Sequence, residues 1–226
     1  MAAKISIVIP TLNAEADLPR CLISLMEGLR EGMIRELIIA DGGSTDLTLD
    51  IAEDAGAEIV SSAPSRGGQL RRGVAATKGA WVLVLHADTV LSPGWAEAVA
   101  MHVAHSRDPA YFRLAFRAPG WMPVWVAGWA NLRSAIWGLP YGDQGLLVTR
   151  AQYEAAGGFP DQPLMEDVAL ARRLGCPLVA LSAVATTSAD RYLRDGWFRR
   201  GARNLWTLTR YRFGADPKDL VASYRR

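Results

Sequence analysis

Short runs of β-branched and other apolar residues alternate with longer amphipathic stretches over the first hundred residues of the chain. This alternation is typical of βαβ units built around a mostly parallel sheet. The expected strands are 5–9, 36–40, 57–61 and 81–85, and the expected helices are 18–32, 47–54, 68–77 and 93–105. For the first helix we expect Asp17 as the N-cap and Pro19 in the first turn. We therefore predict an α/β fold, Rossmann-like, with a mostly parallel central sheet flanked by helices.

Length and composition fit a single domain. The chain has 226 residues, half of them hydrophobic, which is ample for one sizeable core and marginal for two. We expect one domain over 1–226, divided into the regular half 1–105, a less regular part 106–190 and a helical tail 191–226. Residues 1–4 run straight into the first expected strand, without the apolar segment and cleavage site of a secretory signal. We therefore expect a cytoplasmic protein.

The tail 191–226 is strongly basic, with ten Lys and Arg against three Asp, whereas the whole chain has a net charge of +2. Such a segment suits an anionic lipid, a diphosphate or a nucleic acid, and composition alone does not choose among them. A solvated arginine-rich helix face is an equally good interpretation. We expect no nucleic-acid partner, because no recognisable binding module accompanies the charge. A peripheral contact with the inner membrane face stays open.

Four tryptophans lie among small apolar residues in the stretch 121–138, namely Trp121, Trp125, Trp129 and Trp137. Their spacing of four brings the first three near one another on a helix. The uncharged stretch is shorter than the ~20 residues that a transmembrane span needs, and Arg133 interrupts it. We expect these tryptophans to pack in the core or to form a docking surface for an apolar partner, rather than to stack on a sugar.

Three acidic signatures dominate the chain. Asp41 follows one expected strand, Asp88 follows another, and the pair Glu166-Asp167 precedes an amphipathic run. Ligands of open α/β sheets bind outside the carboxyl ends of the strands, so carboxylates that emerge there can converge on one ligand. We expect a single crevice lined by these side chains, which suits a divalent metal together with a phosphate ester.

Two Asp residues in the segment 41–46 have different expected roles. Asp41 is followed by two glycines, which permit positive φ and close approach to a nucleotide. Its carboxylate can accept hydrogen bonds from a base or a ribose hydroxyl, and a purely turn-forming Asp before Gly is an equally weighted interpretation. For Asp46, just before a helix, we expect a capping role.

His86 and Asp88 are potential metal ligands at the end of strand 81–85, on the same side of the pleat. A hard divalent cation needs only one or two carboxylates when a diphosphate supplies the remaining ligands, and imidazole weakly favours manganese. Glu166 and Asp167 are either first-turn acids stabilised by the helix dipole or a catalytic pair. In the catalytic interpretation, Asp167 is a general base that deprotonates a hydroxyl, and Glu166 holds a neighbouring group.

Together these residues resemble the family 2 nucleotide-sugar glycosyltransferases of the GT-A fold. The resemblance rests on four segments that match in order and approximate spacing: Ile5 to Asn13, Asp41 to Asp46, His86-Ala87-Asp88 and Glu166-Asp167. His86-Ala87-Asp88 stands in place of the Asp-x-Asp metal motif of the family. Further segments look like a bacterial branch, the radical-SAM/selenodomain-associated transferases, some of which are linked to arsenosugar biosynthesis: His86 to Thr89, Tyr141 to Gly145 and Gly158 to Pro160.

The resemblance implies a metal-dependent, inverting glycosyltransferase that moves a sugar from a nucleoside-diphosphate sugar to an unidentified hydroxyl acceptor. Asp88, with His86, would bind Mn2+ or Mg2+, and Asp167 would be the catalytic base beside Glu166. The donor-binding residues would be Pro10, Thr11, Asn13, Asp41, Arg66, Gly67, Arg71, His86 and Ala87. The acceptor side would be lined by Gly142, Asp143 and Gln144. The regular half would bind the nucleotide, and the part after it would hold acceptor and catalytic residues.

The chain departs from the wider family pattern at Ala14, where an acid is often found, at His86 in the metal motif, and at Arg71, where many relatives have Asn. Because a single metal-motif acid can signal decay, a catalytically silent nucleotide-sugar binding protein is the main alternative. The intact pair Glu166-Asp167 argues against it. A nucleotidyltransferase of related fold is a weaker alternative, since no glycine-rich loop follows the first strand. A Rossmann dehydrogenase is excluded, because no Gly-x-Gly-x-x-Gly follows a strand.

Overall fold

The computed structural model describes residues 5–225, the side chains of 222–225 excepted, so the expectation for 1–4 lies outside it. The strands are β1 Ile5–Thr11, β2 Ile34–Asp41, β3 Glu58–Ser61, β4 Trp81–Val84, β5 Val90–Leu91, β6 Ala110–Arg117, β7 Leu146–Thr149 and β8 Val179–Ser188. The helices are α1 Leu18–Arg30, α2 Thr48–Asp54, α3 Arg66–Ala76, α4 Trp95–His105, α5 Trp121–Trp137, α6 Arg150–Ala155, α7 Glu166–Leu174, α8 Asp190–Asp195, α9 Trp197–Arg212 and α10 Pro217–Arg225, with a 3₁₀ turn, η1, at Gly142–Gln144.

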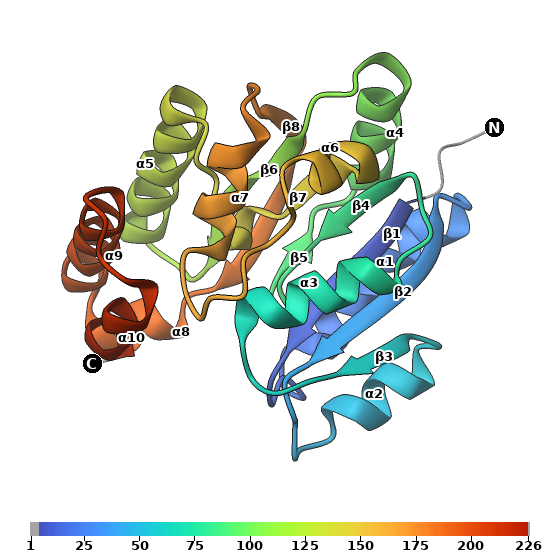
Figure 1. Cartoon of the computed structure of the whole chain (residues 1–226), viewed down its shortest axis with the longest axis horizontal. Coiled ribbons are helices and arrows are strands. Elements are labelled where there is room, and N and C mark those ends of the chain that lie inside the picture. The colour runs from blue at the N-terminus through green and yellow to red at the C-terminus, as the bar shows by residue number, and fades with distance from the viewer. Residues whose placement is uncertain (1–4, 226) are drawn as a thin grey trace.

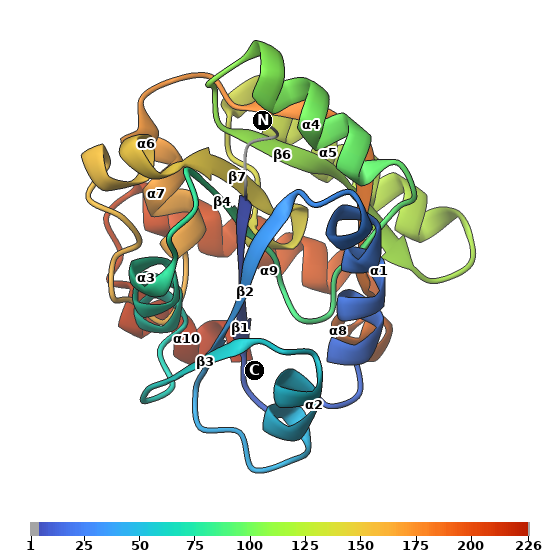
Figure 2. The ribbon, with the colours of Figure 1, turned by 90° about the vertical axis from the view of Figure 1, so that its right-hand side faces the viewer.

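Within the described residues, the eight strands form one sheet in the order β3-β2-β1-β4-β7-β6-β8-β5. The first four of these are parallel neighbours, β6 and β8 are also parallel, and β7 joins the two groups in antiparallel pairing. Helices cover both faces, with α3 and α7 on one side of the sheet and α1 and α4 on the other (Figure 1, Figure 2). The predicted mostly parallel α/β sheet with flanking helices is confirmed.

The first half of the chain agrees with the sequence prediction to within about two residues at most ends. In the first half the two-residue strand β5 was not predicted, and the larger differences lie in the second half, where β7 and β8 were not predicted. β8 is rich in Ala, Ser and Thr, and its side chains alternate between buried and more exposed positions over Leu181–Thr187. The small size of these residues hides a period-2 pattern that larger apolar residues make visible.

The start of α1 shows one correct and one wrong expectation. A proline lies in the first turn, as predicted, because its missing N–H is not needed there. Asp17 occupies the N-cap position but makes no capping hydrogen bond with its side chain. Its Oδ1 instead accepts a 2.6 Å hydrogen bond from Nη2 of Arg117 at the end of β6. The capping interpretation of Asp17 is therefore wrong, since a charged partner from a distant strand competes for the carboxylate.

The tryptophans of 121–138 lie on α5, and all four are exposed, with Trp121 at 68% and Trp137 at 48%. Core packing was therefore the wrong interpretation for these side chains. None of the helices in the described part of the chain combines the length and apolar character required to cross a bilayer. α5 is thus a surface helix whose tryptophans are exposed.

α3 packs directly on β1 and β2 at Gly73, and this contact holds the helix against these two strands. A Cβ atom at Gly73 would lie 2.7 Å from Cγ1 of Val8 and 3.0 Å from Cβ of Ala40. Neighbouring backbone would have to shift to admit a methyl group. The close approach therefore depends on glycine at this position.

We expect Gly73→Ala to lower the free energy of unfolding by about 1–3 kcal/mol, because overpacking outweighs the gain in helix propensity. Gly201→Ala in α9 is a matched control, since a Cβ there has no neighbour within 4 Å. That control should be neutral or stabilising by up to about 1 kcal/mol. Urea unfolding of both variants tests this, and equal effects would contradict the packing argument.

Candidate active site

The candidate site lies at the edge of the sheet where β1, β2 and β4 end. Because these strands are parallel, Thr11, Asp41 and the loop after Val84 leave the sheet on the same side. The first residue of α3 borders this edge, and the turn η1 and the start of α7 approach it from the second half of the chain. A pocket between them is lined by residues that include His86, Tyr141, Gly142, Glu166 and Asp167.

Asp41 is buried and organises the loop after β2. Its Oδ1 accepts hydrogen bonds from Oγ1 of Thr11 at 2.9 Å and from Oγ of Ser44 at 2.5 Å, and its Oδ2 accepts from the backbone N–H of Gly43 and Ser44 at 2.7 and 2.8 Å. Burial alone would raise the pKa of Asp41, but these hydrogen bonds outweigh it and hold the pKa below its ordinary value. The turn-forming interpretation therefore accounts for all these contacts, and a nucleotide contact stays a prediction.

Asn13 and Asp46 tie the loop after β1 to the loop after β2. Asn13 has a left-handed backbone, and its Oδ1 accepts a 2.9 Å hydrogen bond from the N–H of Thr45. Asp46 accepts from the N–H and Oγ1 of Thr48 at the first turn of α2 and from the N–H of Glu15. Leu47 occupies the N-cap position of α2, and Asp46, one residue earlier, still supplies the side-chain oxygen that accepts from the first N–H of the helix.

Gln69 is a residue that the sequence prediction missed. Its Nε2 donates to the carbonyl oxygens of Thr11 at 2.8 Å and Ala40 at 2.9 Å, so one buried side chain joins the ends of β1 and β2 to α3. No motif marks Gln69 in the sequence. Its position one turn after Arg66 on α3 is the only signal that could have found it.

Arg66 lies at the centre of the site. Its Nε forms a 2.9 Å ion pair with Oε1 of Glu166, and its Nη2 contacts the ring nitrogens of His86. The site thereby joins α3, α7 and the loop after β4. Arg71, by contrast, lies further along α3 with an exposed side chain. Among the described residues, its charge acts on Tyr153 and not on the group formed by Arg66, Glu166 and His86.

The N-terminus of α3 contains Gly67, one of the expected donor-binding residues, and already makes hydrogen bonds within the chain. Gly67 donates its N–H to the carbonyl oxygen of Gln162 at 3.1 Å, and its missing Cβ makes room for the backbone of Pro160. Ser65 caps the helix and donates to Oδ1 of Asp161 at 2.5 Å. The role of Gly67 here is close packing, and the side chain of Arg66 is the group that faces the site.

His86 is packed between Arg66 and Gly142. A Cβ at Gly142 would collide with the imidazole ring, so only glycine fits there. Burial, followed by the charges of Arg66 and Arg191, holds the pKa of His86 well below its ordinary value, and the ring is neutral at pH 7. Since the ring nitrogens face a guanidinium, metal binding by His86 would require Arg66 to turn away.

Asp88 and Asp143 each have a buried Oδ1 without a hydrogen-bond partner. Burial raises the pKa of Asp88, and it raises the pKa of Asp143 to about 6, to which the charges of Asp167 and Asp88 also contribute. Thr187 supplies a hydrogen bond to the Asp88 carboxyl. Buried carboxylate oxygens without partners fit a hard cation.

No group of three or more His, Cys, Asp or Glu side chains suited to hold a metal ion occurs among the described residues. The chain therefore fits a cation only in the form that the sequence predicts, with one or two carboxylates from the protein and further oxygen ligands from a bound diphosphate. Asp88 meets this requirement, and Asp143 offers a second free oxygen beside it.

Asp167 and Glu166 open α7 after Met165, whose left-handed backbone is rare for a residue with a side chain. Oδ2 of Asp167 accepts a 2.6 Å hydrogen bond from the N–H of Gly142, and Oδ1 accepts from the N–H of Val168. Glu166 is almost fully buried; burial raises its pKa to about 7, although Arg66 opposes this shift. The pair thus combines an accessible carboxylate with a carboxyl group that is partly protonated near neutral pH.

The segment 141–145 shows that the predicted acceptor-side residues differ in placement. Gly142 lines the pocket, and Asp143 is near enough to Asp167 and Asp88 for their charges to raise its pKa, whereas Gln144 is fully buried. Oε1 of Gln144 accepts a 2.6 Å hydrogen bond from Oγ of Ser134 on α5, and its Nε2 donates to the carbonyl oxygen of Phe112. Gln144 therefore holds the turn against α5 and β6.

Comparison with known proteins places this geometry in a class. The fold is GT-A-like: glucosyl-3-phosphoglycerate synthase of Mycobacterium tuberculosis, solved with Mn2+, uridine diphosphate and phosphoglyceric acid, superposes with a TM-score of 0.57 at 25% identity, over 82% of this chain and 69% of that one. The same enzyme solved with Mg2+ and uridine diphosphate gives a TM-score of 0.58 at 24% identity, over 82% and 70%. Residues 6–129, more than half of the chain, match the model of Glycosyl transferase family 2, and the chain belongs to that family.

Two curated relatives align with shorter parts of the chain. A PGL/p-HBAD biosynthesis glycosyltransferase of Mycobacterium tuberculosis is 40% identical over 97 residues, which are 40% of this chain and 37% of that protein. Glucosyl-3-phosphoglycerate synthase of the same organism is 37% identical over 95 residues, 38% of this chain and 29% of that enzyme. The alignments thus span well under half of either relative.

The raised pKa of Glu166 predicts a pH-dependent stability. A pKa raised from 4.5 to about 7 means that the folded chain binds this proton more tightly than the unfolded chain. The resulting stabilisation is complete below pH 4.5 and is lost as the pH rises through about 7. Relative to the native chain, Glu166→Gln should therefore gain stability as the pH rises across this window. Urea unfolding at several pH values measures it, with the exposed Glu97→Gln as control; parallel profiles for the native chain and Glu166→Gln would refute the assignment.

Proposed function

We propose that this chain is a metal-dependent, inverting glycosyltransferase that moves a sugar from a nucleoside-diphosphate sugar to a hydroxyl acceptor. The observation that carries the proposal is the meeting of Asp88, Asp167 and the Arg66–Glu166 ion pair at the carboxyl edge of the parallel strands. Family membership supports the reaction type. A uridine diphosphate sugar is the proposed donor, because the structurally similar synthase was solved with uridine-diphosphate-glucose and Mn2+.

Donor binding follows from the side chains at the strand ends. Thr11 and Asp41 would contact the nucleoside together with Pro10, after one of the internal hydrogen bonds of Asp41 is exchanged. The guanidinium of Arg66 would face the diphosphate, since a fork of N–H donors suits phosphate oxygens. Gly67, Arg71 and Ala87 stay predictions as donor contacts.

Asp88 would hold the metal, with Asp143 as a second carboxylate. A bound divalent cation stabilises the negative charge that develops on the leaving nucleoside diphosphate. His86 would lie beside the metal and would not bind it directly, because its neutral ring already contacts Arg66. The residues of the chain therefore provide a cation site that is complete only with donor phosphates present.

Asp167 would be the general base. As the acceptor oxygen attacks the anomeric carbon, the bond to the diphosphate breaks, and the acceptor proton passes to the carboxylate of Asp167. The N–H of Gly142 holds that carboxylate in place at 2.6 Å. Glu166, with a pKa of about 7, can donate a hydrogen bond to a neighbouring group in its protonated form.

The acceptor, the branch within the family and the location stay predictions. Phosphoglyceric acid, bound by the similar synthase, is one trial acceptor for this chain. The radical-SAM-associated branch rests on segment resemblance alone. For the basic tail 191–226, contact with the inner membrane face and closure over the bound donor both stay alternative proposals. Closure over the donor is supported by Arg191, whose charge contributes to the lowered pKa of His86.

Asp88→Ala should abolish the manganese-dependent part of the thermal stabilisation by uridine diphosphate. Ligand binding to the native state stabilises it by about 2.7 kcal/mol when the ligand is at about 100 times its Kd. The measurement is a thermal-shift series with uridine diphosphate, with and without Mn2+. Asp50→Ala on the surface of α2 is the control, and an unchanged manganese effect in Asp88→Ala would remove the metal assignment.

Asp167→Asn should lower kcat by about 10²–10⁴-fold while binding of uridine diphosphate stays unchanged, because Asn keeps the shape of the side chain but cannot take the proton. The measurement is release of uridine diphosphate from uridine-diphosphate-glucose with phosphoglyceric acid and other hydroxyl acceptors, with Asp54→Asn as control. Full transfer by Asp167→Asn would refute the base assignment. Donor binding without transfer by the native chain to any acceptor would favour the silent binding protein.

A further inference from the structure

The outward face of α5 carries no charged residue. Its exposed positions are Trp121, Val124, Trp125, Gly128, Trp129, Leu132, Ala135, Ile136 and Trp137. The most exposed of the large side chains are Val124 at 72%, Trp121 at 68% and Ile136 at 63%. The one ionisable residue of the helix, Arg133, is 92% buried, with 8% exposed. α5 is thus apolar on its outer face as well as on its buried face, whereas the outer face of a surface helix usually carries charged side chains.

α9 extends this surface. Phe198, Leu205, Trp206 and Phe213 lie on one side, since spacings of seven and eight return to the same face of a helix. Phe198 is exposed at 64%, Trp206 at 62% and Phe213, just after the helix, at 87%. The rings of Phe198 and Trp125 of α5 lie 5.9 Å apart. The exposed apolar side chains of both helices thus form one continuous face, the α5–α9 face.

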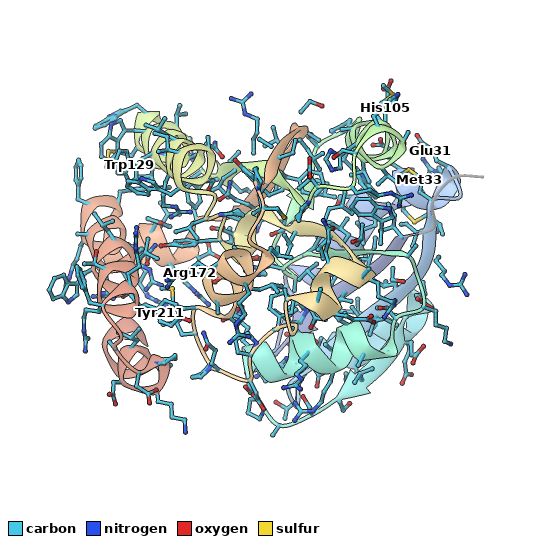
Figure 3. All side chains as sticks on the ribbon, turned by 45° about the horizontal axis from the view of Figure 1, so that its top comes forward. Glu31, Met33, His105, Trp129, Arg172 and Tyr211 are labelled. Carbon is cyan, nitrogen blue, oxygen red and sulfur yellow. The ribbon has the colours of Figure 1, made fainter. Side chains whose placement is uncertain are left out.

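The two helices lie at the same end of the molecule in Figure 1, and Figure 3 labels Trp129 on α5 and Tyr211 on α9 at that end. Single exposed apolar residues are ordinary, but a contiguous patch from two helices marks an interaction surface. No described element of the chain covers it, because each of these large side chains is at least 45% exposed.

Charge identifies the occupant. α9 contains five arginines and no acid, and α5 contains no acid. Arg199 and Arg212 are exposed beside the apolar residues, while Arg200 and Arg203 pair with Asp195 at the base of the helix. Two copies of this face would bring arginines against arginines, which is unfavourable. An anionic surface complements the arginines and accepts tryptophans at the boundary between water and hydrocarbon.

We propose that the α5–α9 face docks on an anionic lipid bilayer, with both helices lying in the plane of the membrane interface. Apolar burial of the aromatic side chains and attraction between arginines and lipid phosphates act together, and neither helix crosses the bilayer. Docking itself does not depend on the glycosyltransferase reaction, whereas its consequence for the acceptor rests on the proposed function.

Docking on this face also orients the site. The inner side of α5 carries Ser134, bound to Gln144 under the turn η1, and Arg133, whose guanidinium stacks 3.6 Å from the ring centre of Tyr141. The helix that lies on the membrane is therefore the helix that supports the acceptor side. A hydroxyl compound held in the membrane surface would reach the site along α5.

The test is co-sedimentation of the full chain with vesicles. We compare phosphatidylcholine vesicles with vesicles of phosphatidylcholine and phosphatidylglycerol in equal parts. We expect binding to the second only, weakened by salt, with a blue shift of tryptophan emission. Trp125→Ser/Trp129→Ser and Arg199→Gln/Arg212→Gln should each bind at least about tenfold more weakly. Ile23→Ser/Met26→Ser, on the exposed side of α1, is the matched control and should bind as the native chain does.

Circular dichroism melting establishes that each variant is folded, and binding of uridine diphosphate shows that the candidate site is intact. Failure of the native chain to bind anionic vesicles, or equal binding by the Trp125→Ser/Trp129→Ser variant, would overturn the proposal. So would analytical ultracentrifugation showing a native dimer that the same double variant dissociates, because the face would then belong to a second copy of the chain. None of these outcomes depends on sugar transfer.

Discussion

The Arg66 guanidinium is the contact on which the rest of the site depends. It contacts both Glu166 at the start of α7 and His86 in the loop after β4. One guanidinium therefore joins a helix from the second half of the chain to a strand end in the first half. A carboxyl group as buried as Glu166 would be costly to ionise without such a partner. Burial, followed by the charge of Arg66, also lowers the pKa of His86 and keeps the imidazole neutral. Loss of this one side chain would affect α3, α7 and the loop after β4 together.

Much of the regular half could be predicted because its strands are made of large β-branched residues and its helices begin at recognisable turns. Asp41, Asp88 and Asp167 were found because each is next to an apolar run that fixes its place at the strand edge or the start of a helix. Asp46 shows that a local rule suffices where the partner, Thr48, is two residues away. β8 was missed because Ala, Ser and Thr carry little periodic signal.

The contacts that sequence could not predict are those between distant segments. Gln69 on α3 donates hydrogen bonds to the ends of two strands. The side chain of Asp17 accepts a hydrogen bond from Arg117, a hundred residues later, and does not cap α1. The same holds for Gly67, whose neighbour is the backbone of Pro160. No local pattern encodes these partners, since they exist only after the sheet has brought the segments together. Exposure of the α5 tryptophans also required the structure, because periodicity gives the face of a helix but not its surroundings.

The hydrogen bond from Gly142 to Asp167 has a stereochemical consequence. Each carboxylate oxygen offers two lone pairs. The N–H of Gly142 takes one on Oδ2, and the N–H of Val168 takes one on Oδ1. With Asp167 as the proposed base, an alcohol that gives up its proton to Oδ2 would therefore arrive along the remaining lone pair, and the backbone amide of Gly142 in η1 would direct its approach.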